Sequence, residues 1–70
     1  MDYRLKTCII IRKNNEYLVG MNWLSNELRW SIDPYDAWRT RKKDFAQDVA
    51  RLVGGVMVLF NPILGEKRIL

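Results

Sequence analysis

The chain has 70 residues, of which 49% are hydrophobic and 29% charged, and its net charge is +4. This length suits one small domain, and this composition is that of a globular chain and not of a disordered one. A single cysteine excludes an intrachain disulfide framework, and the absence of histidine excludes histidine-dependent zinc sites and catalysis.

The first half of the chain predicts three strands. Residues 3–12 alternate apolar and basic side chains over most of their length, which is typical of a strand. Asn14-Asn15 predicts a hairpin turn, because asparagine tolerates positive φ, and residues 16–24 alternate as a second strand. Ser25-Asn26 predicts another turn before a short third strand at residues 27–32, and we expect the tryptophans of strands two and three to face a helix.

A helical period replaces the strand period after Asp33-Pro34. Aspartate at an N-cap followed by proline is a helix start signal, because the carboxylate accepts free amide hydrogens and proline has none. Two interpretations remain open: a helix unbroken from Pro34, or one turn at 34–37 followed by a new helix capped by Thr40, which we favour. Gly54-Gly55 ends the helix. The predicted apolar stripe consists of Phe45, Ala46, Val49, Ala50, Leu52 and Val53.

Two apolar runs belong in the centre of the sheet. Ile9-Ile10-Ile11 and residues 56–60 lack alternation, which indicates strands buried on both faces. We expect the fourth strand beside the first and parallel to it, through a right-handed crossover. The predicted fold is a two-layer βββαβ domain of the α+β class over residues 1–70, with a mostly antiparallel sheet and one helix on one face. Residues 61–70 form either a loose tail or an edge strand.

The most basic segment of the chain is Arg39-Thr40-Arg41-Lys42-Lys43, with four positive charges in five residues. Because the helix dipole disfavours cations at a helix start, the run does not serve helix stability. It is either a solvated helix face or a contact for an anionic partner. Trp38 is either a lid on the core or an exposed anchor. The aromatic and basic residues of this stretch form our preferred protein-binding set: Tyr35, Trp38, Arg39, Arg41, Lys42 and Lys43.

A second basic set indicates an alternative function, nucleic-acid binding. Alternation places Arg4, Lys6, Arg12 and Arg29 on the sheet face away from the helix, where an open face could contact phosphates. A three-stranded sheet backed by one helix is also similar to the AP2-type and integrase arm-binding DNA modules. Pairing of these cations with glutamates on neighbouring strands is the ordinary explanation.

The sequence offers little for catalysis, and we expect no enzyme, no metal and no cofactor. Helix capping explains Asp33 and Asp36, and Asp44 with Asp48 would make a poor cation site on their own. Cys8 is expected to be a partly buried, inert cysteine. No run of eighteen apolar residues occurs, and the first residues lack the layout of a signal peptide. We therefore expect a cytoplasmic protein without a membrane partner.

Four short motifs carry a family resemblance over residues 8–60: Tyr17-Leu18, the stretch 30–37, the stretch 42–46 and the stretch 52–55. They resemble small uncharacterised proteins encoded by phages and prophages of Gram-positive bacteria. The chain departs from them at Trp38-Arg39-Thr40, where such proteins more often have a phenylalanine. The resemblance implies phage origin, action in the host bacterial cytoplasm and binding to a host or phage protein. An anti-CRISPR-like inhibitor of a defence nuclease complex is the expected role, and no catalytic residue is implied.

Overall fold

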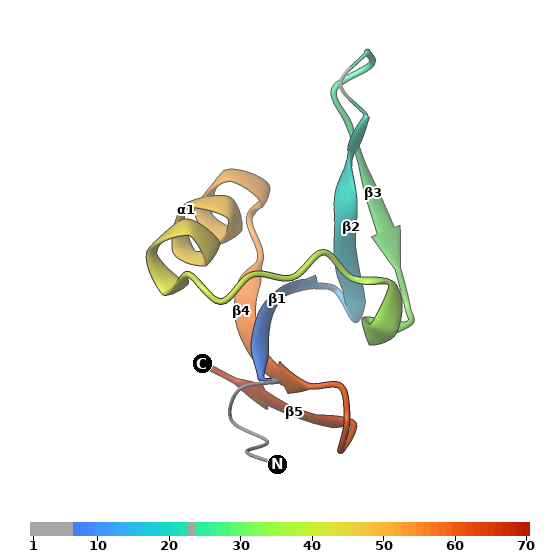
Figure 1. Cartoon of the computed structure of the whole chain (residues 1–70). Coiled ribbons are helices and arrows are strands. Elements are labelled where there is room, and N and C mark those ends of the chain that lie inside the picture. The colour runs from blue at the N-terminus through green and yellow to red at the C-terminus, as the bar shows by residue number, and fades with distance from the viewer. Residues whose placement is uncertain (1–6, 23) are drawn as a thin grey trace.

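The computed structural model describes residues 7–22 and 24–70. This part of the chain forms a five-stranded sheet and one α-helix, which confirms the predicted α+β class. None of its helices is long and apolar enough to cross a membrane. In chain order the elements are β1 (Cys8–Lys13), β2 (Glu16–Asn22), β3 (Glu27–Ser31), the 3-10 helix η2 (Pro34–Asp36), α1 (Lys43–Val53), β4 (Val56–Asn61) and β5 (Glu66–Ile69) (Figure 1).

The strand order is β3-β2-β1-β4-β5, so the two apolar strands lie in the interior of the sheet, as predicted. The predicted direction of β4 is wrong, because β4 pairs with β1 antiparallel, with Ile10 opposite Val58. The reason is an additional pass of the chain along the sheet. Residues 37–42, here called the connector, run antiparallel to β1 at Thr40, and α1 then returns the chain to the other end of β1. The chain therefore passes along the sheet twice between β3 and β4, whereas a single crossover passes once. As a result, β4 runs in the direction opposite to the predicted one.

The connector fills a gap between β1 and β2. These strands pair directly only beside their turn, and the connector then bonds to both of them. The amide of Trp38 donates to the carbonyl of Leu18 at 2.8 Å, and Ile9 and Thr40 exchange backbone hydrogen bonds of 2.7 and 3.0 Å. Figure 1 shows this segment crossing from η2 to α1 over the central strands. The connector is therefore a sixth extended segment of the fold, which periodicity does not reveal.

The helical region is broken as we favoured, but its cap is not Thr40. The helix α1 begins at Lys43, and Lys42 occupies the cap position without a side-chain hydrogen bond. Thr40 cannot cap because its backbone is held in the bridge to Ile9; its hydroxyl instead accepts a hydrogen bond from the Lys42 amide at 3.2 Å. Gly54 ends the helix in the left-handed conformation, with φ 74°, as the glycine pair predicts.

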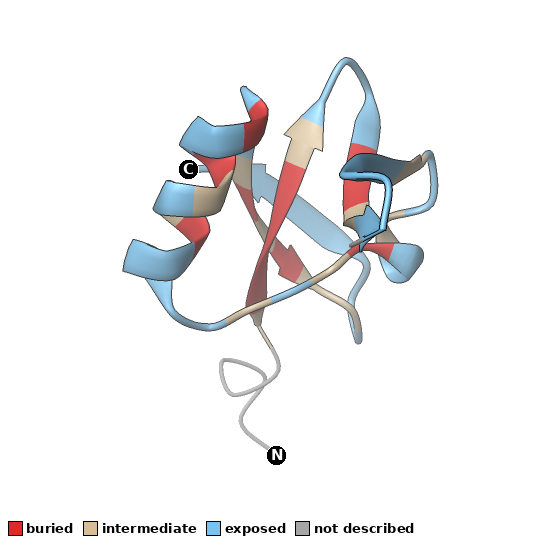
Figure 2. Cartoon of the chain, turned by 90° about the horizontal axis from the view of Figure 1, so that it is seen from above, coloured by how far each residue is buried: buried red, intermediate tan, exposed pale blue. Residues whose placement is uncertain are grey.

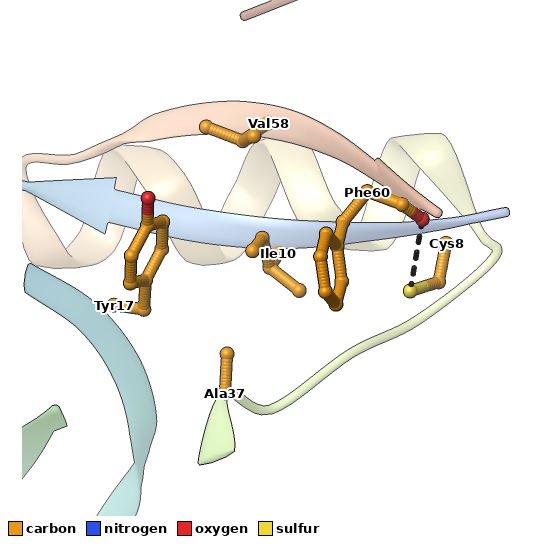
Figure 3. Close-up of a cluster of buried hydrophobic side chains, with 6 residues drawn as sticks. All are labelled: Cys8, Ile10, Tyr17, Ala37, Val58 and Phe60. Atoms are coloured by element: carbon orange, nitrogen blue, oxygen red, sulfur yellow. Dashed lines mark hydrogen bonds between the residues drawn. The ribbon is translucent and has the colours of Figure 1, made fainter. Parts of the chain in front are cut away.

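Both faces of β1 are buried (Figure 2). Alternate residues of β1 and β4 point to opposite sides, and the strands therefore divide the core into two clusters. The helix-side cluster contains Ile9, Ile11, Leu18, Ala46, Ala50 and Val53, and Trp30, Trp38 and Val49 pack against it. The inner cluster, drawn in Figure 3, contains Cys8, Ile10, Tyr17, Ala37, Val58 and Phe60.

The inner cluster corrects the prediction of an open sheet face away from the helix. The sheet curls over this face, and η2 and the β4–β5 turn meet across it. The Tyr35 ring stands edge-on to the Phe60 ring with centroids 5.2 Å apart, and the Tyr35 hydroxyl donates to the carbonyl of Pro62 at 3.0 Å. A curled sheet encloses side chains that a flat two-layer fold would leave in solvent.

The predicted apolar stripe of α1 is too wide. Ala46, Ala50 and Val53 are buried, whereas Phe45 is 53% exposed and Leu52 is 82% exposed. The helix packs mainly on β1 and β4, because the β2–β3 hairpin projects away from it (Figure 1). A support two strands wide covers one row of helix positions, and the neighbouring row stays at the surface.

The remaining strand predictions differ mainly at their ends. The described part of the first strand begins at Cys8; residues 3–6 and Trp23 lie outside the described residues. β2 ends at Asn22, and β3 ends before Ile32, which is exposed. All three asparagines of the two predicted turns have positive φ, as their positions predict: Asn14, Asn15 and Asn26. Residues 66–69 form an edge strand paired with β4, and not a loose tail.

Candidate functional site

The backbone before the basic segment is fixed by a capped turn. Asp33 caps η2, since its carboxylate accepts the Tyr35 amide hydrogen at 2.9 Å, and Pro34 starts the turn, as the sequence predicts. Ala37 is then buried in the inner cluster. The chain leaves Ala37 in an extended conformation and is bonded again at Thr40. The basic segment, residues 39–43, thus starts from an anchored point.

The Arg39 side chain contacts other residues of the fold. Its guanidinium donates to the Tyr35 carbonyl at 3.0 Å and lies 6.0 Å from the centroid of the Phe60 ring. At this distance a cation is attracted by the negative face of the ring. Arg39 therefore links η2 to the inner cluster, while its side chain stays exposed.

Arg41, Lys42 and Lys43 are exposed, as Arg39 is, but they differ from Arg39 in their contacts. None of their side chains forms a hydrogen bond or ion pair with another residue in the described ranges 7–22 and 24–70. Nearby Asp36 accepts a hydrogen bond from Ser31 at 3.1 Å, and it has no ion pair with the basic segment. These cations keep their charge available to a partner.

Two shallow depressions border these cations. The first is lined by Cys8, Arg39, Thr40, Arg41, Lys42 and Pro62. The second lies at the start of α1 and is lined by Lys42, Lys43, Asp44, Phe45 and Asp48. The surface around the basic segment is therefore of mixed charge, with carboxylates on its helix side.

The aromatic residues divide between core and surface. Trp38 is half-buried against the helix-side cluster, and its ring centroid lies 5.7 Å from that of Phe45. It acts mainly as a lid on the core. Tyr35 is 51% exposed. Phe45, which periodicity assigns to the core, is exposed and lines the same depression as Lys42 and Lys43. No sequence signal distinguishes it from its buried neighbours.

Cys8 lies at the floor of the first depression and is 5% exposed. Burial raises the pKa of the Cys8 thiol, and the positive charges of Arg39 and Arg41 lower it by less. The thiol is 3.5 Å from the carbonyl of Phe60, to which it donates (Figure 3). A protonated, buried thiol is a poor nucleophile, in line with the inert role expected for it.

Two residues of the second predicted basic set, Arg12 and Arg29, lie in the described part of the chain. Arg4 and Lys6 lie outside the described residues. Arg12 is opposite Tyr17 on the inner side of the curl and donates to the side chain of Asn15, whereas Arg29 lies opposite Gly20 on the projecting hairpin. The structure instead brings Lys67 and Arg68 of β5 close to Arg12. Sequence analysis missed this grouping, because the residues are more than fifty positions apart.

Within residues 7–22 and 24–70, no three potential metal-ligating side chains of histidine, cysteine, aspartate or glutamate lie together. Comparison of the chain with protein-family models, with curated proteins and with solved structures found no match. The fold and the site define a small α+β domain that displays a cationic segment on an anchored, extended connector.

Proposed function

We propose that this domain is a binding module whose basic segment contacts an acidic surface of another protein. The observation that carries the proposal is the exposure of Arg41, Lys42 and Lys43 without a carboxylate partner in the described chain. Surface cations without internal partners contribute little to stability, and an acidic partner would attract them.

The backbone under these cations is already ordered. Thr40 is held to Ile9 by two backbone hydrogen bonds, and α1 starts at Lys43. Binding therefore orders side chains and not backbone, at a cost of about 0.5–1.5 kcal/mol for each long side chain. Phe45 adds exposed aromatic surface beside Lys42, and aromatic residues are frequent at the energetic centre of interfaces.

The arrangement of charge favours a protein over a nucleic acid. Asp44 and Asp48 line the same depression as Lys42 and Lys43. A continuous phosphate backbone passing over this surface would meet those carboxylates, whereas a protein surface has acidic and basic groups side by side. The charged patch is also short, since α1 places acidic residues immediately after it.

The resemblance to phage and prophage proteins narrows the proposal. On that basis the partner is an acidic host or phage protein, with a subunit of an antiviral defence complex as the expected class, and the module acts by binding without a catalytic step. Nucleic-acid binding through the same segment is the alternative, because phosphates also attract Arg41, Lys42 and Lys43.

A charge-reversal experiment tests the proposal. The variant Arg41→Glu, Lys42→Glu is compared with the control Arg29→Glu, Arg51→Glu, which changes the net charge equally at exposed positions on β3 and the end of α1. Proteins captured from a bacterial lysate by the wild-type chain are purified, and their affinity for all three chains is measured. We expect affinity to fall at least about tenfold in the first variant only, and to weaken with salt.

Equal affinity for both variants, or no captured protein, would refute the role of the segment. A labelled DNA duplex is titrated in parallel. Binding of the duplex with a log–log salt slope of about −0.9 for each phosphate neutralised, lost in the first variant, would replace the protein partner with a nucleic acid.

A further inference from the structure

A second cationic site lies at the other end of the inner cluster. It is a depression, here called the cationic mouth, lined by Arg12, Tyr17, Val58, Lys67, Arg68 and Ile69. Its cations come from β1 and β5, which β4 separates in the sheet. Neither the proposed function nor the basic segment involves these residues.

Strand register fixes two of the cations on the same side of the sheet. Arg12 lies opposite Tyr17, and Lys67 lies opposite Phe60, and both of these aromatic residues belong to the inner cluster. The Lys67 ammonium lies 5.8 Å from the centroid of the Tyr17 ring. Arg12 and Lys67 therefore approach the buried Tyr17 from two strands at the opening of the curl.

Among the residues that the structure describes, no aspartate or glutamate lines the mouth. Glu16 is paired with Lys13, one position along from the Arg12–Tyr17 pair, and alternation directs its side chain to the other face. Glu66 precedes Lys67 and is directed to the other side of the strand for the same reason. It lines a different depression, which Lys67 and Arg68 also border. The Arg12 guanidinium donates to the neutral amide of Asn15, which leaves its positive charge uncompensated.

Such an arrangement is unfavourable for folding by itself. Two like charges repel one another, and the apolar side chains of Val58 and Ile69 at the same opening reduce the screening by water. A doubly charged anion would reverse the sign of this interaction. Arginine presents a planar fork of donors that matches a phosphate, and lysine adds a compact charge.

We propose that the cationic mouth binds the phosphate group of a small phosphorylated molecule, held by Arg12 and Lys67 beside the ring of Tyr17. The phosphate oxygens accept hydrogen bonds from the guanidinium and the ammonium, and Val58 and Ile69 form the apolar side of the site. Arg68 also lines the mouth, and its positive charge adds to the attraction for the anion.

The competing explanation is structural, in that the stem and charge of Lys67 simply cover Tyr17. The variant Lys67→Met separates the two roles, because it keeps an unbranched stem over the ring and removes the charge. Arg12→Gln removes the second cation. The matched control is Arg51→Gln, which removes an exposed arginine in the last turn of α1.

The experiment is a titration of the full chain with inorganic phosphate and with O-phospho-L-serine at low ionic strength, followed by NMR of the Val58 and Ile69 methyl groups. We expect saturable shifts for both probes. Lys67→Met and Arg12→Gln should each weaken binding about tenfold, since each removes a charged hydrogen-bond donor. Arg51→Gln should leave the affinity within about twofold. Binding of phosphoserine should weaken at about pH 5, because its second pKa is about 6.

The absence of saturable shifts would overturn the proposal, as would equal weakening in all three variants or wild-type affinity in the Lys67→Met chain. Thermal unfolding of each variant shows whether the fold is kept; Lys67 is exposed, so its replacement leaves the core intact. If the mouth binds, the two probes identify the source: equal affinity indicates recognition of the phosphate alone, and tighter binding of phosphoserine indicates recognition of the ester as well.

Discussion

Two groups of cations in the described chain differ in how their side chains are held. In the basic segment, Arg41, Lys42 and Lys43 are exposed, and their side chains form no hydrogen bond or ion pair with the described residues. The cationic mouth is concave, and its Lys67 is positioned over the Tyr17 ring while Arg12 bonds to Asn15. Cations held in place suit one compact anion, whereas cations without internal partners steer a broad acidic surface, and their attraction weakens with salt.

Both sites depend on the same support. Phe60 packs at the centre of the inner cluster, next to Cys8 and Ile10, and its ring contacts Tyr35 and Arg39 on the connector side. Its strand neighbour across the sheet is Lys67 of the mouth. Replacement of Phe60 should therefore affect both sites, whereas a change next to one site should affect that site alone.

The largest expected effect is that of Phe60→Ala. The Phe60 side chain is completely buried, and its removal leaves a cavity between the two sites, so we expect the free energy of unfolding to fall by about 3–5 kcal/mol. Denaturant unfolding measures this loss. The control Leu52→Ala changes a side chain that is almost fully in solvent and should cost less than about 0.5 kcal/mol. Similar losses in both variants would show that the inner cluster is not the main core.

A change next to Arg12 should have a smaller effect on stability and should impair binding only at the cationic mouth. In Gly55→Ala the new Cβ would lie 2.8 Å from a methyl carbon of Ile11 and 2.9 Å from the carbonyl oxygen of Arg12. We expect a loss of about 1–3 kcal/mol, with displacement of Arg12 and weaker phosphate binding, while binding through the basic segment persists.

The matched control for this change is Gly20→Ala, because nothing lies within 4 Å of its added Cβ. It should leave the free energy of unfolding unchanged or raise it by up to about 1 kcal/mol. Equal destabilisation by the two alanines, measured by denaturant unfolding, would contradict the close approach of β1 to Gly55.

A change beside the connector should affect the other site. Asp33→Ala removes the cap of η2 and should cost about 1 kcal/mol. Because η2 positions the start of the connector, affinity for the acidic partner should fall and phosphate binding at the mouth should not. Asp33→Asn, which keeps a capping oxygen, should retain most of the stability. Unfolding and binding of the three chains are compared; a loss of phosphate affinity in Asp33→Ala would contradict the separation of the sites.

The smallest expected effect is the pH dependence due to Cys8. Burial raises the pKa of this thiol above its ordinary value of 9.0, so the folded chain holds the proton to higher pH than the unfolded chain does. The resulting stability is fully present below pH 9.0 and is lost as the pH rises through the folded-state pKa. The free energy of unfolding of the wild type should therefore decline more steeply in alkali than that of Cys8→Ala.

The same thiol reports on the basic segment. Arg41 lowers the pKa of Cys8, so Arg41→Gln should raise it further and slow alkylation of the folded chain in alkali. Lys43→Gln, which removes a charge outside the depression of Cys8, is the control. Unchanged alkylation in Arg41→Gln would place Arg41 too far from the thiol to act on it.

Local chemistry predicted the elements of the fold well. Paired asparagines predicted the first turn, the Asp33-Pro34 pair predicted the capped turn η2, and the glycine pair predicted the end of α1. The basic segment was also visible, because a contiguous run of charge needs no tertiary information. Each of these features depends on neighbouring residues, whose effects are contained in the sequence.

The direction of β4, the exposure of Phe45 and the grouping of Arg12 with Lys67 were decided by tertiary structure. The direction of β4 follows from the connector, which pairs with Ile9 through backbone groups that every residue has. Phe45 is exposed because α1 rests mainly on β1 and β4. Backbone pairing leaves no mark in side-chain periodicity, so the additional pass of the chain was invisible until the strands were assembled. Because that pass reverses β4, the edge strand β5 places Lys67 over the Tyr17 ring. Lys67 then lies next to Arg12, which is more than fifty residues away in the sequence.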